Sequence, residues 1–105
     1  MLLVETSVFT RRVQALLTDE EYRLLQLHIV FQPESGAVIK GSGGLRKVRW
    51  SIGSRGRRGG VRVIYHWSER RNRIVLLLIY SKSERDDMTP DQLKRLRKLV
   101  EAEYR

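Results

Sequence analysis

The sequence predicts an α+β protein in which a small, mostly antiparallel, twisted sheet has its helices packed on one face. Apolar residues recur with a helical period near both ends of the chain, within 7–33 and 89–104. Between them, residues 45–50 and 61–67 alternate apolar and polar side chains, as strands do. The run IVLLLIY, residues 74–80, is continuously apolar, which is typical of a central strand covered on both faces. The expected order of elements is β-α-α-β-β-β-α.

A chain of 105 residues suits one domain, which we expect to span residues 1–105 and to bury a core without cross-links. It contains no cysteine, which fits a reducing compartment. The N-terminal segment MLLVETSVFTRR becomes charged too soon for a signal peptide. The longest apolar run is far shorter than the roughly 20 residues of a transmembrane helix. These features predict a cytoplasmic protein that has no membrane partner.

The first segment, MLLVE, is a candidate strand, and a helix is expected directly after it. Phe9, Val13, Leu16 and Leu17 lie at i, i+4, i+7 and i+8, which places them on one face of that helix. We expect this face to pack against the sheet.

A second helix is predicted to begin at a T-x-x-E capping box formed by Thr18 and Glu21. The acidic residues at 19–21 suit the positive end of the helix dipole, and Pro33 and Gly36 end the helix. Because this helix is apolar on more than one side, we expect it to be well covered.

The two alternating strands sort their charged side chains between opposite faces. Along LRKVRW, Lys47 and Arg49 lie on one face and Arg46 lies on the other. Along VRVIYHW, Arg62 and His66 lie opposite the face formed by the valine and aromatic residues. If that apolar face meets the helices, Arg62 and His66 face outward, and Lys47 and Arg49 join them. The connection between the two strands, SIGSRGRRGG, is too long for a tight turn.

The C-terminal helix is predicted to begin at Thr89, with Pro90 in its first position and Gln92 completing a second capping box. Its apolar face is formed by Leu93, Leu96 and Val100.

Positive charge is concentrated in one third of the chain. The net charge is +9, and residues 40–73 contain eleven of the 21 lysines and arginines but a single acid, Glu69. The remainder of the chain is close to neutral. A one-sided field of this kind indicates a polyanion as the partner, and a concave sheet face lined by cations would hold phosphates.

Several kinds of catalytic site lack support in the sequence. His28 and His66 stand far apart without clustered carboxylates, so we predict no metal site and no cofactor, and we interpret His28 as a core or rim residue. The chain lacks both cysteine and a G-x-S-x-G motif. The GSGG segment at 41–44 precedes a strand and lacks the spacing of a phosphate-binding P-loop.

The remaining polar residues suit cleavage of RNA without a metal. The 2'-hydroxyl must lose a proton, a pentacoordinate phosphorane must be stabilised, and the leaving 5'-oxygen must gain a proton. Arginines can stabilise the phosphorane, and a carboxylate or a lysine with a lowered pKa can accept the proton. An equally weighted alternative is that these residues are ordinary polar side chains at strand ends. The candidate catalytic residues are Lys47, Arg49, Arg62, Tyr80, Lys82 and Glu84.

The chain also resembles the RelE/HigB-type toxins of bacterial toxin–antitoxin modules. The resemblance runs from EEYRLLQ to the C-terminal helix and rests on the ordered combination of GLRKVRW, GGVRVIYHW and IVLLLIYSKSERDDMTPDQ. Within the RelE/ParE superfamily, it matches the HigB-like branch best. It implies a RelE-like fold, cleavage of messenger RNA in the ribosomal A site, and a cognate antitoxin that neutralises the toxin.

The resemblance assigns family positions to residues of this chain. The basic pair on the second long strand corresponds to Lys47 and Arg49, and the arginine on the next strand corresponds to Arg62. Where some members have a late tyrosine or arginine, this chain reads SERDDMT, which leaves the general acid and base open. The polar cluster after the last strand corresponds to Tyr80, Lys82 and Glu84.

On this hypothesis, Arg49 and Arg62 stabilise the scissile phosphate and Lys47 positions it. Lys82 or Glu84 moves the protons. Further contacts to RNA are expected from Arg46, Arg55, Arg57, Arg58, His66 and Arg85.

Tyr80 would stack on a base or orient the 2'-hydroxyl. Lysine and arginine ordinarily titrate far above neutral pH, so such a site should be slow on free RNA. Alignment of the messenger by the ribosome would supply several kcal/mol, up to roughly 7–11 in the best intramolecular cases. Two alternatives stay open: a non-enzymatic, ParE-like inhibitor of DNA gyrase, and a non-catalytic module that binds RNA or ribosomes.

Overall fold

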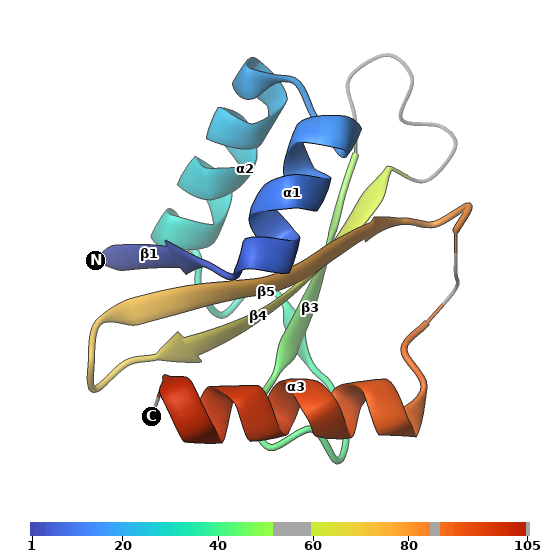
Figure 1. Ribbon diagram of the computed structural model, residues 1–105. Coiled ribbons are helices and arrows are strands. Elements are labelled where there is room, and N and C mark those ends of the chain that lie inside the picture. Colours follow the sequence, from blue (N-terminus) through green and yellow to red (C-terminus); the bar gives the residue numbers. More distant parts are fainter. Residues whose placement is uncertain (52–59, 85–86, 105) are drawn as a thin grey trace.

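The computed structural model describes residues 1–51, 60–84 and 87–104. The strands form one sheet in the order β1-β5-β4-β3-β2, in which β1 runs parallel to β5 and the other neighbours are antiparallel. The α+β class and the predicted order of elements are confirmed, and the two-residue strand β2 is an addition. The elements, in chain order, are β1 (Leu2–Glu5), α1 (Ser7–Leu16), α2 (Asp19–Phe31), β2 (Ala37–Val38), β3 (Arg46–Trp50), β4 (Val61–Ser68), β5 (Arg73–Ser81) and α3 (Pro90–Glu103) (Figure 1).

The second and third helices begin at the predicted capping boxes. The hydroxyls of Thr18 and Thr89 accept hydrogen bonds from the N–H groups of Glu21 and Gln92, whose side chains accept from the threonine N–H groups in return. Each cap of this kind stabilises a helix by about 1 kcal/mol. Among the described residues, none of the helices combines the length and the apolar character needed to span a membrane.

Strand β5 contains a bulge at Leu77. Its neighbours Leu76 and Leu78 pair with consecutive residues of β4, so Leu77 lies between two pairs. The Leu77 carbonyl accepts a hydrogen bond at 2.9 Å from the hydroxyl of Thr6, the N-cap residue of α1. The bulge therefore ties the start of α1 to the middle of the sheet.

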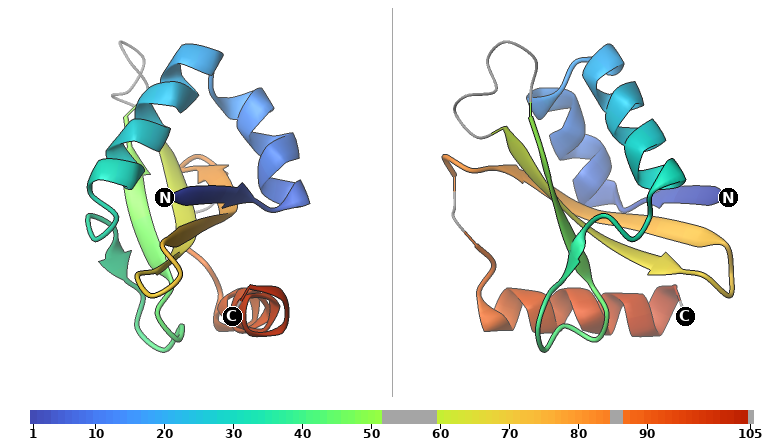
Figure 2. Two further views of the ribbon diagram at one scale, coloured as in Figure 1. Left: turned by 90° about the vertical axis from the view of Figure 1, so that its left-hand side faces the viewer. Right: turned by 180° about the vertical axis from the view of Figure 1, so that it is seen from behind.

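The sheet carries a hydrophobic core on each face. The two views in Figure 2 show helices α1 and α2 on one side of the sheet and α3 on the other. Helices α1 and α2 cover one face through Phe9, Val13, Leu25 and Ile29. Helix α3 covers the opposite face, so it departs from the predicted arrangement with every helix on one side. Helix α3 packs there because the continuous apolar run of β5 places hydrophobic side chains on both faces of the sheet, and both sets must be buried. The core under α3 contains Leu45, Ile64, Val75, Leu77, Tyr80, Met88 and Val100.

The outer side of α2 is uncovered. Leu24, Leu27 and Phe31 are 46%, 42% and 77% exposed, whereas Leu25 and Ile29 on the inner side are fully buried. The expectation that this helix is well covered is wrong. Apolar composition indicates that a surface can be buried, but it does not say whether the cover belongs to the same chain.

Candidate functional site

Three of the candidate residues form a row across the sheet. Arg49 of β3 lies directly opposite Arg62 of β4, and Arg62 lies opposite Tyr80 of β5. Cross-strand neighbours have Cα atoms about 4.5–5.5 Å apart and project their side chains to one face. This is the α3 face, because Tyr80 belongs to the core under α3. Strand alternation thus brings the two arginines together, as the sequence predicts.

Lys47 lies on the same face, two residues before Arg49, and contacts an acid. Its Nζ atom is 3.2 Å from a carboxylate oxygen of Asp87, with the lysine side chain 20% exposed and that of Asp87 68% exposed. A hydrogen bond from the Met88 N–H and the charge of Lys47 hold the pKa of Asp87 below its ordinary value. Asp87 is therefore an ionised neighbour of the cations. No local pattern in the sequence indicates this contact, because forty residues separate Asp87 from Lys47.

The two arginines place like charges opposite each other on adjacent strands. Arg62 is only 6% exposed, whereas Arg49 is exposed at the rim. Like charges directly opposite in a sheet are destabilising, and a guanidinium keeps its charge even when buried. Two adjacent guanidiniums are a set of donors that one phosphate can bridge by accepting hydrogen bonds from both. The observed register thus gives the pair of arginines that the sequence predicts for a phosphate site.

The face is less open than strand alternation alone suggests. Arg62 and His66, which were expected to face outward, are 6% and 7% exposed. Tyr80 is fully buried in the same core as Met88, so no face of its ring is available to a nucleobase in this conformation. The reason is again α3 and the residues leading into it, which cover this side of the sheet.

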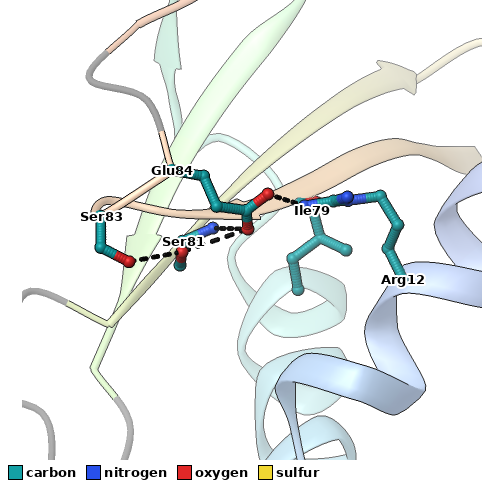
Figure 3. Close-up of polar contacts among 5 residues, drawn as sticks. All are labelled: Arg12, Ile79, Ser81, Ser83 and Glu84. Atoms are coloured by element: carbon teal, nitrogen blue, oxygen red, sulfur yellow. Dashed lines mark hydrogen bonds and ion pairs between the residues drawn. The ribbon is translucent and has the colours of Figure 1, made fainter.

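Lys82 and Glu84 follow Tyr80 in a turn. Lys82 still continues the ladder between β4 and β5, because its N–H donates to the Gly60 carbonyl, whereas Glu84 leaves it. The prediction for Glu84 assumed that the chain stays extended, but the Glu84 N–H donates to the Ser81 carbonyl at 3.1 Å and the chain bends. The Glu84 carboxylate then accepts hydrogen bonds from the Ser81 N–H at 2.9 Å and the Ser81 hydroxyl at 3.1 Å. It also forms an ion pair with Arg12 of α1 (Figure 3).

The electrostatic surroundings of Glu84 oppose a role as a general base. The Ser81 N–H, with a smaller contribution from the Arg12 guanidinium, lowers the pKa of Glu84 below its ordinary value. A carboxylate with a lowered pKa accepts protons poorly at neutral pH. Glu84 also faces α1, on the side of the sheet opposite Arg62 and Tyr80, because its partner Ser81 alternates with Tyr80 along β5.

The other predicted RNA contacts are spread more widely. Arg46 lies on the α1–α2 face, where its guanidinium donates to the Glu34 and Gly36 carbonyls at 3.0 and 2.7 Å and lies over the Trp67 ring. His66 lies under α3. In the described part of the chain, no three histidine or acidic side chains gather as a metal site would require. Arg55, Arg57, Arg58 and Arg85 lie outside the described residues.

Two adjoining depressions flank the candidate site and share His28. One, of about 440 Å³, is apolar and runs along the outer side of α2. The other, of about 520 Å³, leads to Lys47 and Arg49. The His28 ring lies 5.1 Å from the Trp50 ring and its Nε2 atom lies 3.2 Å from the Ser35 hydroxyl. Of the two positions predicted for His28, core or rim, the structure shows a partly exposed residue at the rim.

The contact between Asp87 and Lys47 leads to a test of anion binding. Replacing Asp87 with asparagine removes a carboxylate that competes with phosphate for Lys47, so we expect a labelled single-stranded RNA to bind about two- to fivefold more tightly. Fluorescence anisotropy at low salt measures the change. Asp91→Asn removes the same charge from the first turn of α3, so equal tightening by both variants would contradict a specific role for Asp87.

Comparison with known proteins supports the architecture. No protein-family profile matches the sequence. Among solved structures, the chain is similar to a variant of the E. coli toxin RelE in the free state in which two arginines are replaced by alanine, with a TM-score of 0.61, 13% identity, and coverage of 90% of this chain and 95% of that one. It is also similar to a chain of the intact E. coli RelBE toxin–antitoxin complex, with a TM-score of 0.57, 13% identity, and coverage of 76% and 94% respectively. The chain therefore has the RelE fold, whereas its assignment to the HigB-like branch stays a prediction.

Proposed function

We propose that this chain is the toxin of a toxin–antitoxin pair and that it acts as a metal-independent, ribosome-dependent mRNA endoribonuclease. The observation that carries the proposal is the row of Arg49 and Arg62 with Lys47 beside it, on one face of a RelE fold. The concentration of positive charge within residues 40–73 supports a polyanionic substrate.

In the proposed mechanism, Arg49 and Arg62 neutralise the charge that develops on the phosphorane when the 2'-hydroxyl attacks. Lys47 exchanges Asp87 for the scissile phosphate and orients it. Lys82, exposed on the turn after β5, is the remaining candidate for proton transfer: its amine would accept the proton that the 2'-hydroxyl loses and return it to the leaving 5'-oxygen. Tyr80 supports Arg62 from the neighbouring strand rather than stacking on a base.

The site contains few groups suited to proton transfer at neutral pH, which accounts for the need for a ribosome. Cations bind the phosphate and stabilise charge, but they do not by themselves align the attacking hydroxyl. A ribosome that holds the messenger in line would supply that alignment. Free RNA should accordingly bind in a salt-sensitive manner and be cut slowly.

The experiment incubates the purified protein with translating ribosomes and maps the 5' ends of the messenger. New ends on ribosome-bound transcripts, with free transcripts intact, are the expected result. Inhibition of gyrase supercoiling with an intact messenger would replace the proposal with the ParE-like alternative. Salt-sensitive binding to ribosomes without new messenger ends would show that the protein is a non-catalytic module that binds RNA or ribosomes.

We also propose that the antitoxin covers the apolar depression on α2 with an amphipathic helix. Leu24, Leu27 and Phe31 are spaced as one stripe along α2, which is how a groove receives a second helix. The depression continues toward Lys47 and Arg49, which favours acidic residues at one end of the partner. A second copy of this chain is a poor occupant, because each copy carries a net charge of +9.

Replacing Leu27 and Phe31 together with glutamate should abolish recovery of that partner. The measurement is quantitative mass spectrometry of the small acidic protein that purifies with the tagged chain from its native host. Leu2→Glu, at an apolar position 61% exposed on β1, is the control and should retain the partner. Undiminished recovery with the double variant would show that the antitoxin binds elsewhere.

A further inference from the structure

Arg12 joins α1 to the end of β5 and to the turn that follows it. Its Nε atom donates a hydrogen bond at 2.7 Å to the Ile79 carbonyl, and its terminal nitrogen pairs with Glu84 (Figure 3). Strand β1 pairs with β5 only as far as Leu76, so in this part of the sheet the guanidinium takes the place of a strand partner. One side chain therefore restrains both the strand and the turn.

Glu84 continues this restraint back to the strand. Its carboxylate accepts from both the N–H and the hydroxyl of Ser81, and the Ser81 hydroxyl lies 3.0 Å from that of Ser83. Lys82 lies inside the loop closed by these contacts, and its N–H donates to the Gly60 carbonyl at 3.4 Å. Gly60 immediately precedes β4, the strand that carries Arg62. The contacts thus connect α1, through the turn, to the strands of the candidate site.

We propose that Arg12 and Glu84 are positioning residues for the site: they hold the Ser81–Glu84 turn so that Lys82 is presented beside the Arg49–Arg62–Tyr80 row, without contacting RNA. This inference rests on the proposed function. It gives Glu84 a role in keeping with its ion pair to α1, in place of the proton transfer that its sequence position suggested.

The Arg12–Glu84 pair is partly exposed, so replacing either residue should leave the protein folded. The Arg12 and Glu84 side chains are 34% and 35% exposed, so the pair adds little to global stability. The same pair acts on a turn that carries a proposed catalytic residue. Misplacement of such a residue by a fraction of an ångström to one ångström lowers turnover strongly while leaving substrate affinity almost unchanged.

Positioning and general-base catalysis predict different variants to be defective. If Glu84 accepts the proton, only Glu84→Gln lowers cleavage severely and flattens the pH–rate profile of the residual activity, while Arg12→Ala remains active. If the pair positions the turn, Arg12→Ala and Glu84→Gln each lower kcat by about tenfold. In that case KM is unchanged, the shape of the pH profile is retained, and the double variant is no worse than either single variant.

The experiment measures kcat and KM for mRNA cleavage on programmed ribosomes with the full chain. Arg12→Lys can keep one of the two contacts that Arg12 makes with the Ile79 carbonyl and the Glu84 carboxylate, so its kcat should lie between those of Arg12→Ala and the parent. A general loss of fold would not explain such a partial recovery. Arg23→Ala breaks the exposed pair with Glu20 on α2, at 3.1 Å, and serves as the matched control with parental kcat. Thermal unfolding of each variant confirms that the chain is folded.

Each outcome bears on a separate claim. A parent protein that leaves ribosome-bound mRNA intact would overturn the proposed function, and this inference with it. A parent that cuts, together with an Arg12→Ala variant of equal kcat, would overturn the inference alone. Loss of activity confined to Glu84→Gln would overturn it in favour of proton transfer by Glu84.

Discussion

Arg62→Ala is expected to lower the rate of mRNA cleavage on translating ribosomes by about a hundredfold or more. Arg62 is the central residue of the row, opposite Arg49 on one side and Tyr80 on the other, and it is only 6% exposed. A guanidinium held this firmly needs little reorganisation when charge develops on the phosphorane. The rate is measured by primer extension on ribosome-bound transcripts at saturating protein.

Two further variants show whether the effect of Arg62→Ala comes from the geometry of the guanidinium, from the loss of a positive charge, or from the removal of any arginine of the sheet. Arg62→Lys keeps the charge but loses the forked donor geometry, so it should remain defective. Arg73→Ala removes a guanidinium from the far end of β5, where it lies over the Tyr104 ring, and should cut like the parent. If Arg62→Ala is folded by thermal unfolding and cuts at the parental rate, the assignment of the site is wrong.

Among the glycines that the structure describes, Gly60 is expected to be the one whose replacement by alanine is most destabilising, lowering the free energy of unfolding by about 3 kcal/mol. Gly60 has φ of +61°, and a Cβ atom there would lie 2.0 Å from the Trp50 carbonyl oxygen and 2.9 Å from the Ser51 Cα atom. Both obstacles are backbone atoms of the neighbouring chain segment, so β3 and β4 would have to separate where Arg49 and Arg62 face each other. Urea unfolding followed by circular dichroism measures the loss.

Gly41 provides the matched comparison. It has a similar φ of +74°, but a Cβ atom added there meets nothing within 4 Å. Gly41→Ala should therefore cost only the conformational penalty of about 1 kcal/mol. Equal destabilisation by the two variants would show that the close approach of the strands at Gly60 has no energetic weight.

The candidate cations could be predicted to share a face because strand alternation is a local property. Successive side chains of a strand point to opposite faces whatever the rest of the molecule does. The pattern in LRKVRW and VRVIYHW therefore places Lys47 and Arg49 on one face and Arg62 on the equivalent face of its own strand. Antiparallel pairing in the observed register then sets Arg49 opposite Arg62.

The same reasoning failed for Glu84 because alternation ends where the strand ends. Tyr80 still follows the strand, but the chain turns after Ser81 and sends the Glu84 carboxylate to Arg12, seventy-two residues away in the sequence. A contact over that distance depends on how α1 lies along the edge of β5. The pattern of residues around Glu84 contains no information about it.

By itself, the sequence determined the helices, the caps of α2 and α3, the long strands, the identity of their two faces and the concentration of positive charge. These follow from side-chain period, local hydrogen bonding and composition, which act over a few residues. Only the tertiary structure decided that α3 covers the second face of the sheet, that Asp87 meets Lys47, and that Tyr80 is enclosed. Those outcomes depend on which segments, distant in the sequence, bury their apolar surfaces against each other. An apolar face of a sheet can be buried by any segment that is long enough to reach it and fits its shape, so the local pattern does not specify which one.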